Sequence, residues 1–187
     1  MRRLRLTPFY YMEYKVENII SDEDRVELIK LYNSIPSTKA SQDYNLFKVD
    51  KRRISNERLE DKAFSKLDQY ADRPVYSHYF VMYEEGSFTR MHTDNDKDVT
   101  LTIVTLLDSQ DLIGGETIVS LPFEYKGREE NEYRKGNVPD KEHRVVPKVV
   151  NVDKGQSMVY NRSLLHGVAQ VEKGKRLVLV SWYGKSV

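Results

Sequence analysis

The chain has 187 residues and a mass of 22.0 kDa, which is the size of one domain with a sizeable hydrophobic core. Its 30 basic and 29 acidic residues leave a net charge of +1, and this balance argues against nucleic acid or an anionic membrane as a partner. Because the chain has no cysteine, disulfides, zinc–thiolate sites and thiol nucleophiles are excluded, and His, Asp and Glu must supply any metal ligands.

The first residues of the chain are basic but do not predict a signal peptide. Arg5, Thr7 and Pro8 interrupt the apolar run that such a peptide needs. No segment elsewhere approaches the roughly 20 apolar residues that cross a bilayer. We therefore expect a soluble, cytoplasmic protein without a membrane partner.

Two amphipathic helices are predicted in the N-terminal part of the chain. Residues 21–36 begin with the capping-box pair Ser21 and Asp24 and end at a proline. The apolar face of this helix consists of Leu28, Leu31, Tyr32 and Ile35. A second helix is expected over residues 56–71, with an inward face of Leu59, Ala63, Leu67 and Tyr70. We expect residues 1–74 to form a helical support that covers a sheet.

From residue 75 onward the apolar period changes from 3.6 to 2, which predicts short strands separated by turns. The expected strands are residues 75–84, 88–94, 99–107, 116–121, 145–152, 156–161, 165–171 and 176–183. This order predicts a mainly β fold with N-terminal α-helices. The core would be a double-sheet jelly roll, a cupin-like double-stranded β-helix over residues 75–187 of a single domain spanning 1–187.

A charged segment, residues 122–148, interrupts the strand pattern. It is too long for an ordinary hairpin loop. We predict a lid over a functional site, because long loops within small domains are often functional, and a disordered segment is the alternative.

Three side chains have the chemistry of a metal site. His92 and Asp94 lie two apart in a predicted strand, so they project from the same face, and His166 begins a later strand. Taken singly, each is weak evidence, and a surface or backbone-bonded histidine is the simpler interpretation. Together, two imidazoles and one carboxylate can hold one face of an octahedral iron(II) ion and leave the other face open.

A buried cation is predicted in the last strand. Arg176 shares one face of that strand with Val178, Val180 and Trp182, and an unpaired charge buried there costs about 3–5 kcal/mol. A carboxylate should therefore meet it, either from the protein or from a small diacid, and the bidentate geometry of guanidinium favours the diacid. A turn predicted at residues 173–175 would fold this strand back toward His166.

With this combination of residues the chain resembles the iron(II) and 2-oxoglutarate-dependent dioxygenase superfamily, most closely its prolyl 4-hydroxylase branch. The resemblance spans about Val75 to Tyr183. The matching residues are Tyr83, Gly86, His92, Asp94, Asn95, Gly114, Gly115, Glu116, Gly155, His166, Gly167, Gly174, Arg176 and Trp182.

The resemblance implies a role for each polar residue of the motif. His92, Asp94 and His166 would ligate iron(II) and form the catalytic centre. Arg176, together with the hydroxyl of Tyr83, would bind the distal carboxylate of the co-substrate 2-oxoglutarate. Some members of the branch have lysine in place of this arginine, and either cation can serve. Tyr83 is expected to approach the metal across the sheet, through the turn at Gly86.

The implied reaction is hydroxylation of a C–H bond by dioxygen, coupled to decarboxylation of 2-oxoglutarate to succinate. Ascorbate is expected as an accessory cofactor. Asp94 favours hydroxylation over halogenation, because related halogenases lack this carboxylate. Since neutral imidazoles must bind the metal, activity is expected to fall as the pH drops below the histidine range.

The substrate expected from the branch is a prolyl residue of a protein or peptide. The first alternative is the same chemistry on a free amino acid or another small molecule. Nucleic-acid demethylases of the superfamily have a second arginine where this chain has Trp182. A noncatalytic jelly-roll binding module that retains a metal is the alternative from a different class. His78 and His143 are expected to be structural or surface residues.

Overall fold

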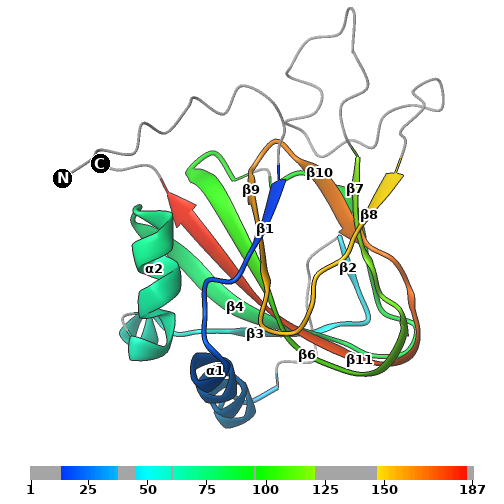
Figure 1. The fold of residues 1–187 in the computed structure, drawn as a ribbon, viewed down its shortest axis with the longest axis horizontal. Helices are drawn as coiled ribbons and strands as arrows, with labels where there is room; N and C mark the ends of the chain where they lie inside the picture. The colour runs from blue at the N-terminus through cyan, green and yellow to red at the C-terminus, as the bar shows by residue number, and fades with distance from the viewer. Residues whose placement is uncertain (1–13, 38–44, 60, 95, 121–146, 185–187) are drawn as a thin grey trace, which may run out of the picture.

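Two antiparallel β-sheets make up the body of the computed structural model, which describes residues 14–37, 45–59, 61–94, 96–120 and 147–184 (Figure 1). The six-stranded sheet has the order β1 (Tyr14–Glu17), β9 (Ser157–Asn161), β6 (Val99–Gly114), β11 (Val171–Gly184), β4 (Val75–Tyr83), β3 (Asp50–Arg53). The five-stranded sheet has the order β2 (Leu46–Phe47), β5 (Phe88–His92), β10 (Leu165–Val168), β7 (Thr117–Ser120), β8 (Pro147–Val150). The predicted mainly β jelly roll with N-terminal helices is confirmed.

Helices cover the face of the six-stranded sheet that points away from the second sheet (Figure 1). The helical elements are α1 (Asp22–Ser34), two 3-10 turns, η1 (Asn56–Arg58) and η2 (Lys62–Phe64), and α2 (Ser65–Ala71). Strand alternation separates two apolar layers, because Phe80 and Leu179 pack with the helices while Val81 and Val178 pack between the sheets. The space between the sheets is therefore bounded by side chains of both.

The first predicted helix is confirmed as α1. Ser21 is its N-cap, with Oγ accepting a hydrogen bond from the Asp24 amide and the Asp24 carboxylate accepting one from the Ser21 amide. Leu28 and Tyr32 are buried on the inward face.

The second predicted helix is only partly correct. The backbone is extended at Asp61, which separates η1 from η2 and α2. This break changes the helical phase, so Phe64, Leu67 and Ala71 face the core. Tyr70, predicted to point inward, is 42% exposed.

The eight predicted strands correspond to β4 through β11, with changed boundaries. The turn predicted at residues 173–175 is wrong, since β11 begins at Val171 and runs through them. Gly174 has a φ of 82° and lies at a bulge, where a Cβ atom would be 2.2 Å from the carbonyl oxygen of Gln110. The strands β1 to β3 were not predicted, because each has only two to four residues.

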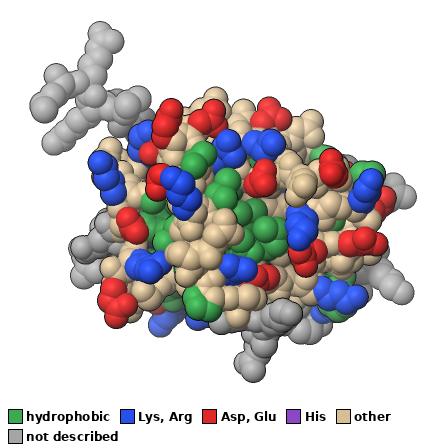
Figure 2. Space-filling model, turned by 90° about the horizontal axis from the view of Figure 1, so that it is seen from below, with side chains coloured by type: hydrophobic (Ala, Val, Ile, Leu, Met, Phe, Trp, Pro, Cys, Tyr) green, Lys and Arg blue, Asp and Glu red, His purple; other side chains and the backbone are tan. Residues whose placement is uncertain are grey.

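Some sequence expectations fall outside the described residues. These are the structure of residues 122–146, which make up nearly all of the predicted lid, and the place of His143. Among the described residues, no helix is both long and apolar enough to cross a membrane. Acidic and basic side chains are interspersed around a central group of hydrophobic ones on the face seen in Figure 2, in agreement with the balanced net charge.

His78 has the structural role predicted for it. The side chain is fully buried, its Nδ1 lies 2.9 Å from Ser181 Oγ, and its ring stacks on Phe64 at 4.3 Å between centroids. It thereby joins β4 to the helical layer.

The packing of α1 on the sheet leads to a first prediction. Leu28 is fully buried, so Leu28→Ala should lower the free energy of unfolding by about 2–5 kcal/mol. Val26 lies on the same helix and is 43% exposed, so Val26→Ala should change it by no more than about 0.5 kcal/mol. Urea denaturation measures both values, and equal losses in the two variants would contradict the packing of α1.

Candidate metal centre

Two histidines face each other across neighbouring strands of the five-stranded sheet. His92 is the last residue of β5, and His166, in β10, is its register partner in the antiparallel pair. Their ring centroids are 4.4 Å apart, at an angle of 49°. The strand pairing therefore brings together two residues that are far apart in the sequence.

The backbone orients both imidazoles in the same way. Nδ1 of His92 donates to the carbonyl oxygen of Arg90 at 2.8 Å, and Nδ1 of His166 donates to that of Leu164 at 3.0 Å. A proton on Nδ1 leaves the lone pair of a neutral imidazole on Nε2. Both Nε2 atoms are thus available as acceptors or metal ligands.

Asp94 completes the cluster from just beyond the end of β5. Its Oδ1 lies 3.9 Å from Nε2 of His92 and 3.9 Å from Nε2 of His166, and its side chain is 3% exposed. Its Oδ2 accepts a 2.6 Å hydrogen bond from the hydroxyl of Thr102 in β6. Thr102 thus fixes one carboxylate oxygen and leaves the other directed at the histidines.

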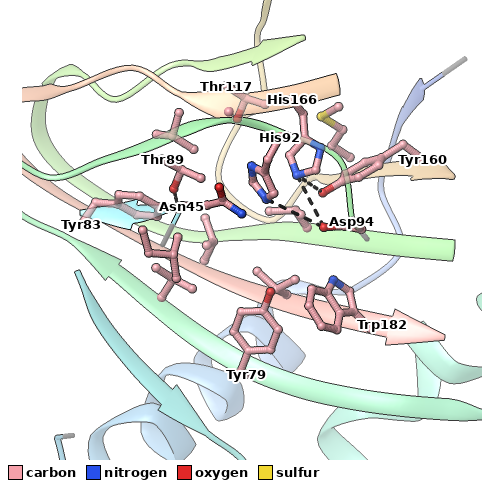
Figure 3. Close-up of a pocket in the computed structure, with 18 of the residues that line it drawn as sticks. Asn45, Tyr79, Tyr83, Thr89, His92, Asp94, Thr117, Tyr160, His166 and Trp182 are labelled. Atoms are coloured by element: carbon pink, nitrogen blue, oxygen red, sulfur yellow. Dashed lines mark hydrogen bonds and ion pairs between the residues drawn. The ribbon is translucent and has the colours of Figure 1, made fainter. Parts of the chain in front are cut away.

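Each of the three residues offers one ligand atom, and these atoms all lie within 4.8 Å of one another (Figure 3). Two neutral imidazoles and a carboxylate are a donor set that suits iron(II) and leaves further coordination positions open. The hydrogen bonds at Nδ1 and at Oδ2 are the outer contacts that a metal site of this type uses to orient its ligands. The residues present therefore fit a metal ion.

Arg176 reaches the same space from the opposite sheet. It lies on β11, is 4% exposed, and donates from Nη2 to the hydroxyl of Thr117 on β7 at 2.8 Å. Its Nη1 is buried without a hydrogen-bond partner among the described residues, and no described carboxylate forms an ion pair with it. Burial lowers the pKa of this guanidinium, while the phenols of Tyr83 and Tyr160 raise it. A buried cation with a spare donor is a site for an anion.

Tyr83 lies near Arg176, but not by the expected route. It belongs to β4 in the six-stranded sheet, where it is the register partner of Arg176, whereas His92 is in the other sheet. The chain passes between the sheets at Gly86, so the predicted approach across one sheet is wrong. The Tyr83 hydroxyl is 2.7 Å from Thr89 Oγ1, and the Arg176 guanidinium lies over the Tyr83 ring at 5.4 Å.

A cavity of about 140 Å³ between the two sheets is lined by the histidine cluster and by Arg176. Its wall includes aromatic and aliphatic side chains: Tyr79, Val81, Val104, Met158, Val178, Val180 and Trp182. The indole Nε1 of Trp182 is buried and has no hydrogen-bond partner within the described part of the chain. Trp182 therefore contributes a free donor to this wall as well as packing.

This cavity, with a His-Asp-His cluster at one end and a buried arginine at the other, agrees with the comparison with protein families. The family model of the 2OG-Fe(II) oxygenase superfamily matches residues 78–184, which is more than half of the chain. The chain belongs to this superfamily. The superfamily resemblance seen in the sequence is thereby confirmed.

Solved structures with the same fold include two prolyl hydroxylases and a protein solved with 2-oxoglutarate bound. A prolyl-4-hydroxylase of Pseudomonas putida is 15% identical, with a TM-score of 0.61 and coverage of 96% of each chain. HygX of Streptomyces hygroscopicus, solved with nickel and 2-oxoglutarate bound, is 15% identical, with a TM-score of 0.66 and coverage of 100% of this chain and 88% of that one.

A third structure is the viral collagen prolyl hydroxylase of Paramecium Bursaria Chlorella virus-1 in complex with 2OG, at 13% identity and a TM-score of 0.60, covering 92% of this chain and 96% of that one. At such low identity these likenesses concern the fold. No curated protein sequence matches the chain.

Three side chains that support the site of this oxygenase were not predicted from the sequence: Thr102, Thr117 and Tyr160. Thr117 directly follows the Gly-Gly-Glu segment of the motif, and this proximity was a usable signal. Thr102 and Tyr160 carry no local signal, because their contacts with Asp94 and His166 are made across the two sheets. In the sequence, Tyr160 has the pattern of an ordinary strand residue.

The environment of His166 in this oxygenase leads to a second prediction. Burial lowers the pKa of His166 to about 4, and nearby His92 adds to this effect while Asp94 opposes it. Between about pH 6.5, where an unfolded histidine takes up a proton, and about pH 4, the unfolded state binds a proton that the folded state does not. Stability contributed by the neutral imidazole should therefore be complete above this range and fall by about 3 kcal/mol across it.

Urea denaturation near pH 7 and near pH 4, in the presence of a metal chelator, tests this expectation. The wild type should lose more stability than His166→Asn, which has no group titrating there, and the other titrating groups are common to both proteins. Equal losses in the two proteins would contradict a depressed pKa at His166.

Proposed function

We propose that this protein is an iron(II)- and 2-oxoglutarate-dependent dioxygenase that hydroxylates a C–H bond of a prolyl residue in a protein or peptide, with decarboxylation of 2-oxoglutarate to succinate. The observation that supports it most strongly is the cavity with two chemically different ends. The cluster at one end has three ligand atoms within 4.8 Å, and Arg176 at the other end has a buried, unused donor. A metal and a dicarboxylate together account for both.

At the metal end, His92, Asp94 and His166 would hold Fe(II) on one face. The carbonyl groups that accept from Nδ1 keep both Nε2 lone pairs on the cavity side, and Thr102 keeps Asp94 Oδ1 there. When bound, iron and 2-oxoglutarate supply the oxidising chemistry, while the protein supplies orientation and a dry site. The aliphatic and aromatic side chains of both sheets would limit the access of bulk water to this centre.

At the other end of the cavity, Arg176 would bind the distal carboxylate of 2-oxoglutarate. Guanidinium forms two parallel hydrogen bonds with a carboxylate, and Nη1 is buried without a partner among the described residues. Thr117, which accepts from Nη2, holds the guanidinium in place and has a hydroxyl proton left to donate. Tyr83 packs its ring against this guanidinium.

The cavity wall favours an uncharged ring as the reacting part of the substrate. Apart from the histidine cluster and Arg176, the described lining residues carry no charge, so the ammonium and carboxylate groups of a free amino acid would have no partners there. The Trp182 Nε1 donor suits the amide oxygen of a peptide. A prolyl ring packed against the wall that Tyr79 and Trp182 form together, where their rings meet edge to face at 5.3 Å between centroids, satisfies both features.

The same chemistry on a small molecule is the second candidate. The likeness to HygX, which has been solved with hygromycin B bound, is at least as close in TM-score as the likeness to the prolyl hydroxylases. Ascorbate as an accessory reductant and a cytoplasmic location complete the proposal. These two assignments rest on the resemblance and on composition alone.

Substitution of the metal ligands gives a third prediction. The wild type incubated with iron(II), 2-oxoglutarate, ascorbate and pooled proline-containing peptides should produce succinate and a peptide heavier by one oxygen. His92→Ala and Asp94→Ala should lose this coupled turnover by a factor of at least about 100, because each removes one of the three proposed protein ligands. Circular dichroism controls for the fold, and mass spectrometry follows both products.

The outcome separates the candidates. Oxygen transfer to a metabolite pool but not to any peptide would favour the small-molecule function. Metal binding without any conversion of 2-oxoglutarate would instead support a noncatalytic metal-retaining module. Undiminished succinate production by the folded ligand variants would contradict the assigned centre.

Substitution at the arginine end of the cavity gives a fourth prediction. In protein loaded with Mn²⁺, Arg176→Gln should weaken 2-oxoglutarate binding by about 10- to 100-fold, because it removes a charge-assisted pair. Thr117→Val should weaken it by about two- to tenfold. Lys175→Gln is the matched control, since Lys175 is the exposed neighbour on the same strand and should leave the affinity unchanged. Isothermal titration calorimetry measures all three, and an unaltered affinity in Arg176→Gln would exclude the assigned role.

A further inference from the structure

Tyr160 lies at the histidine cluster without belonging to the proposed ligand set. It is on β9 of the six-stranded sheet and is 3% exposed, with its hydroxyl 3.0 Å from Nε2 of His166 and its ring centroid 4.6 Å from the imidazole centroid. Figure 3 shows dashed lines that join the phenol oxygen of Tyr160 and the carboxylate of Asp94 to the same ring nitrogen of His166. The phenol thus meets the atom of His166 that faces the metal position.

The direction of this hydrogen bond follows from the other side of the ring. Nδ1 of His166 donates to the carbonyl oxygen of Leu164, so in the neutral imidazole Nε2 carries the lone pair and accepts. The Tyr160 hydroxyl is therefore the donor. Its proton occupies the one lone pair through which His166 could bind a metal ion.

An sp² nitrogen has a single lone pair, which can accept a proton donor or ligate a metal ion but cannot do both. Metal binding at His166 must therefore break the hydrogen bond from Tyr160. The phenol is 3% exposed and packs with Met158 and Leu164, so its hydroxyl has little access to bulk water. The lost hydrogen bond is a cost of metal binding that a phenylalanine would not impose.

We propose that Tyr160 is a positioning residue that sets the metal affinity of the centre by competing with the metal for Nε2 of His166. This inference rests on the proposed function in that His166 is taken as a metal ligand. The hydrogen bond holds the imidazole in its metal-binding orientation and at the same time weakens metal binding. Its cross-strand partner Thr102 acts differently, because it bonds the Asp94 oxygen that does not face the histidines.

Orientation of His166 and competition for its lone pair predict opposite changes in metal affinity when the Tyr160 hydroxyl is removed. If Tyr160 only orients His166, removal of its hydroxyl should weaken metal binding. If it competes for the lone pair, Tyr160→Phe should bind the metal more tightly. The expected gain is about two- to tenfold, the range for one neutral hydrogen bond.

The experiment is a calorimetric titration of chelator-treated protein with Mn²⁺ alone, which requires no turnover. Wild type, Tyr160→Phe, His166→Ala and Tyr32→Phe are compared. Tyr32 is the matched control, since it belongs to α1, does not line the cavity, and donates from its hydroxyl to Asp50 at 3.4 Å. Thermal unfolding with and without Mn²⁺ gives a second reading, and Tyr160→Phe should show the lower melting temperature without metal and the larger rise with it.

The outcomes separate this inference from the proposed function. Tighter binding by Tyr160→Phe, with Tyr32→Phe equal to the wild type and His166→Ala strongly weakened, supports the competition. Equal or weaker binding by Tyr160→Phe, while His166→Ala still loses the metal, overturns the competition and leaves the proposed metal centre standing. Failure of the wild type to bind Mn²⁺, or unaltered binding by His166→Ala, would overturn both.

Discussion

The antiparallel register between β5 and β10 is the constraint on which the rest of the site depends. It places His92 directly opposite His166 and aligns their Nε2 atoms with Asp94. The two strands approach closely at Gly167, where a Cβ atom would lie 2.8 Å from the carbonyl oxygen of Thr89. Because any larger residue would push the strands apart, the glycine next to the histidine is part of the geometry of the centre.

The stacking of the two sheets adds the second half of the site. The proposed metal ligands come from the five-stranded sheet, whereas Arg176 and Tyr83 come from the six-stranded one. The hydrogen bond from Arg176 to Thr117 crosses the space between the sheets and ties the guanidinium to the sheet that carries the two histidines. Desolvation of the guanidinium is costly, and the proposed anion would offset part of that cost by accepting a hydrogen bond from its unused donor.

Two polar groups around the cluster form hydrogen bonds with opposite effects on the proposed ligands. Thr102 and Tyr160 are cross-strand partners on β6 and β9, and each bonds one proposed ligand on the other sheet. One bond leaves the ligand atom free, and the other occupies it. Burial raises the pKa of the Tyr160 phenol well above its usual value, so this group stays a neutral donor. We therefore infer that the polar surroundings orient the proposed ligands and also influence their affinity for a metal ion.

The amino-acid sequence by itself determined the strand alternation, the first helix and its cap, and the residue types of the site. These features are local: period-two patterning selects the inward residues of β11, and the spacing of His92 and Asp94 predicts that they project together. The second helix was predicted only in part, because the backbone is extended at Asp61, and the turn at residues 173–175 was mispredicted. In place of this turn there is a bulge at Gly174, which depends on the pairing of β11 with β6.

Only the tertiary structure decided which sheet each functional residue belongs to, what Arg176 bonds, and that Tyr160 reaches His166. The physical reason is that strand register and sheet stacking join residues far apart along the chain, and no local pattern encodes the atoms that meet there.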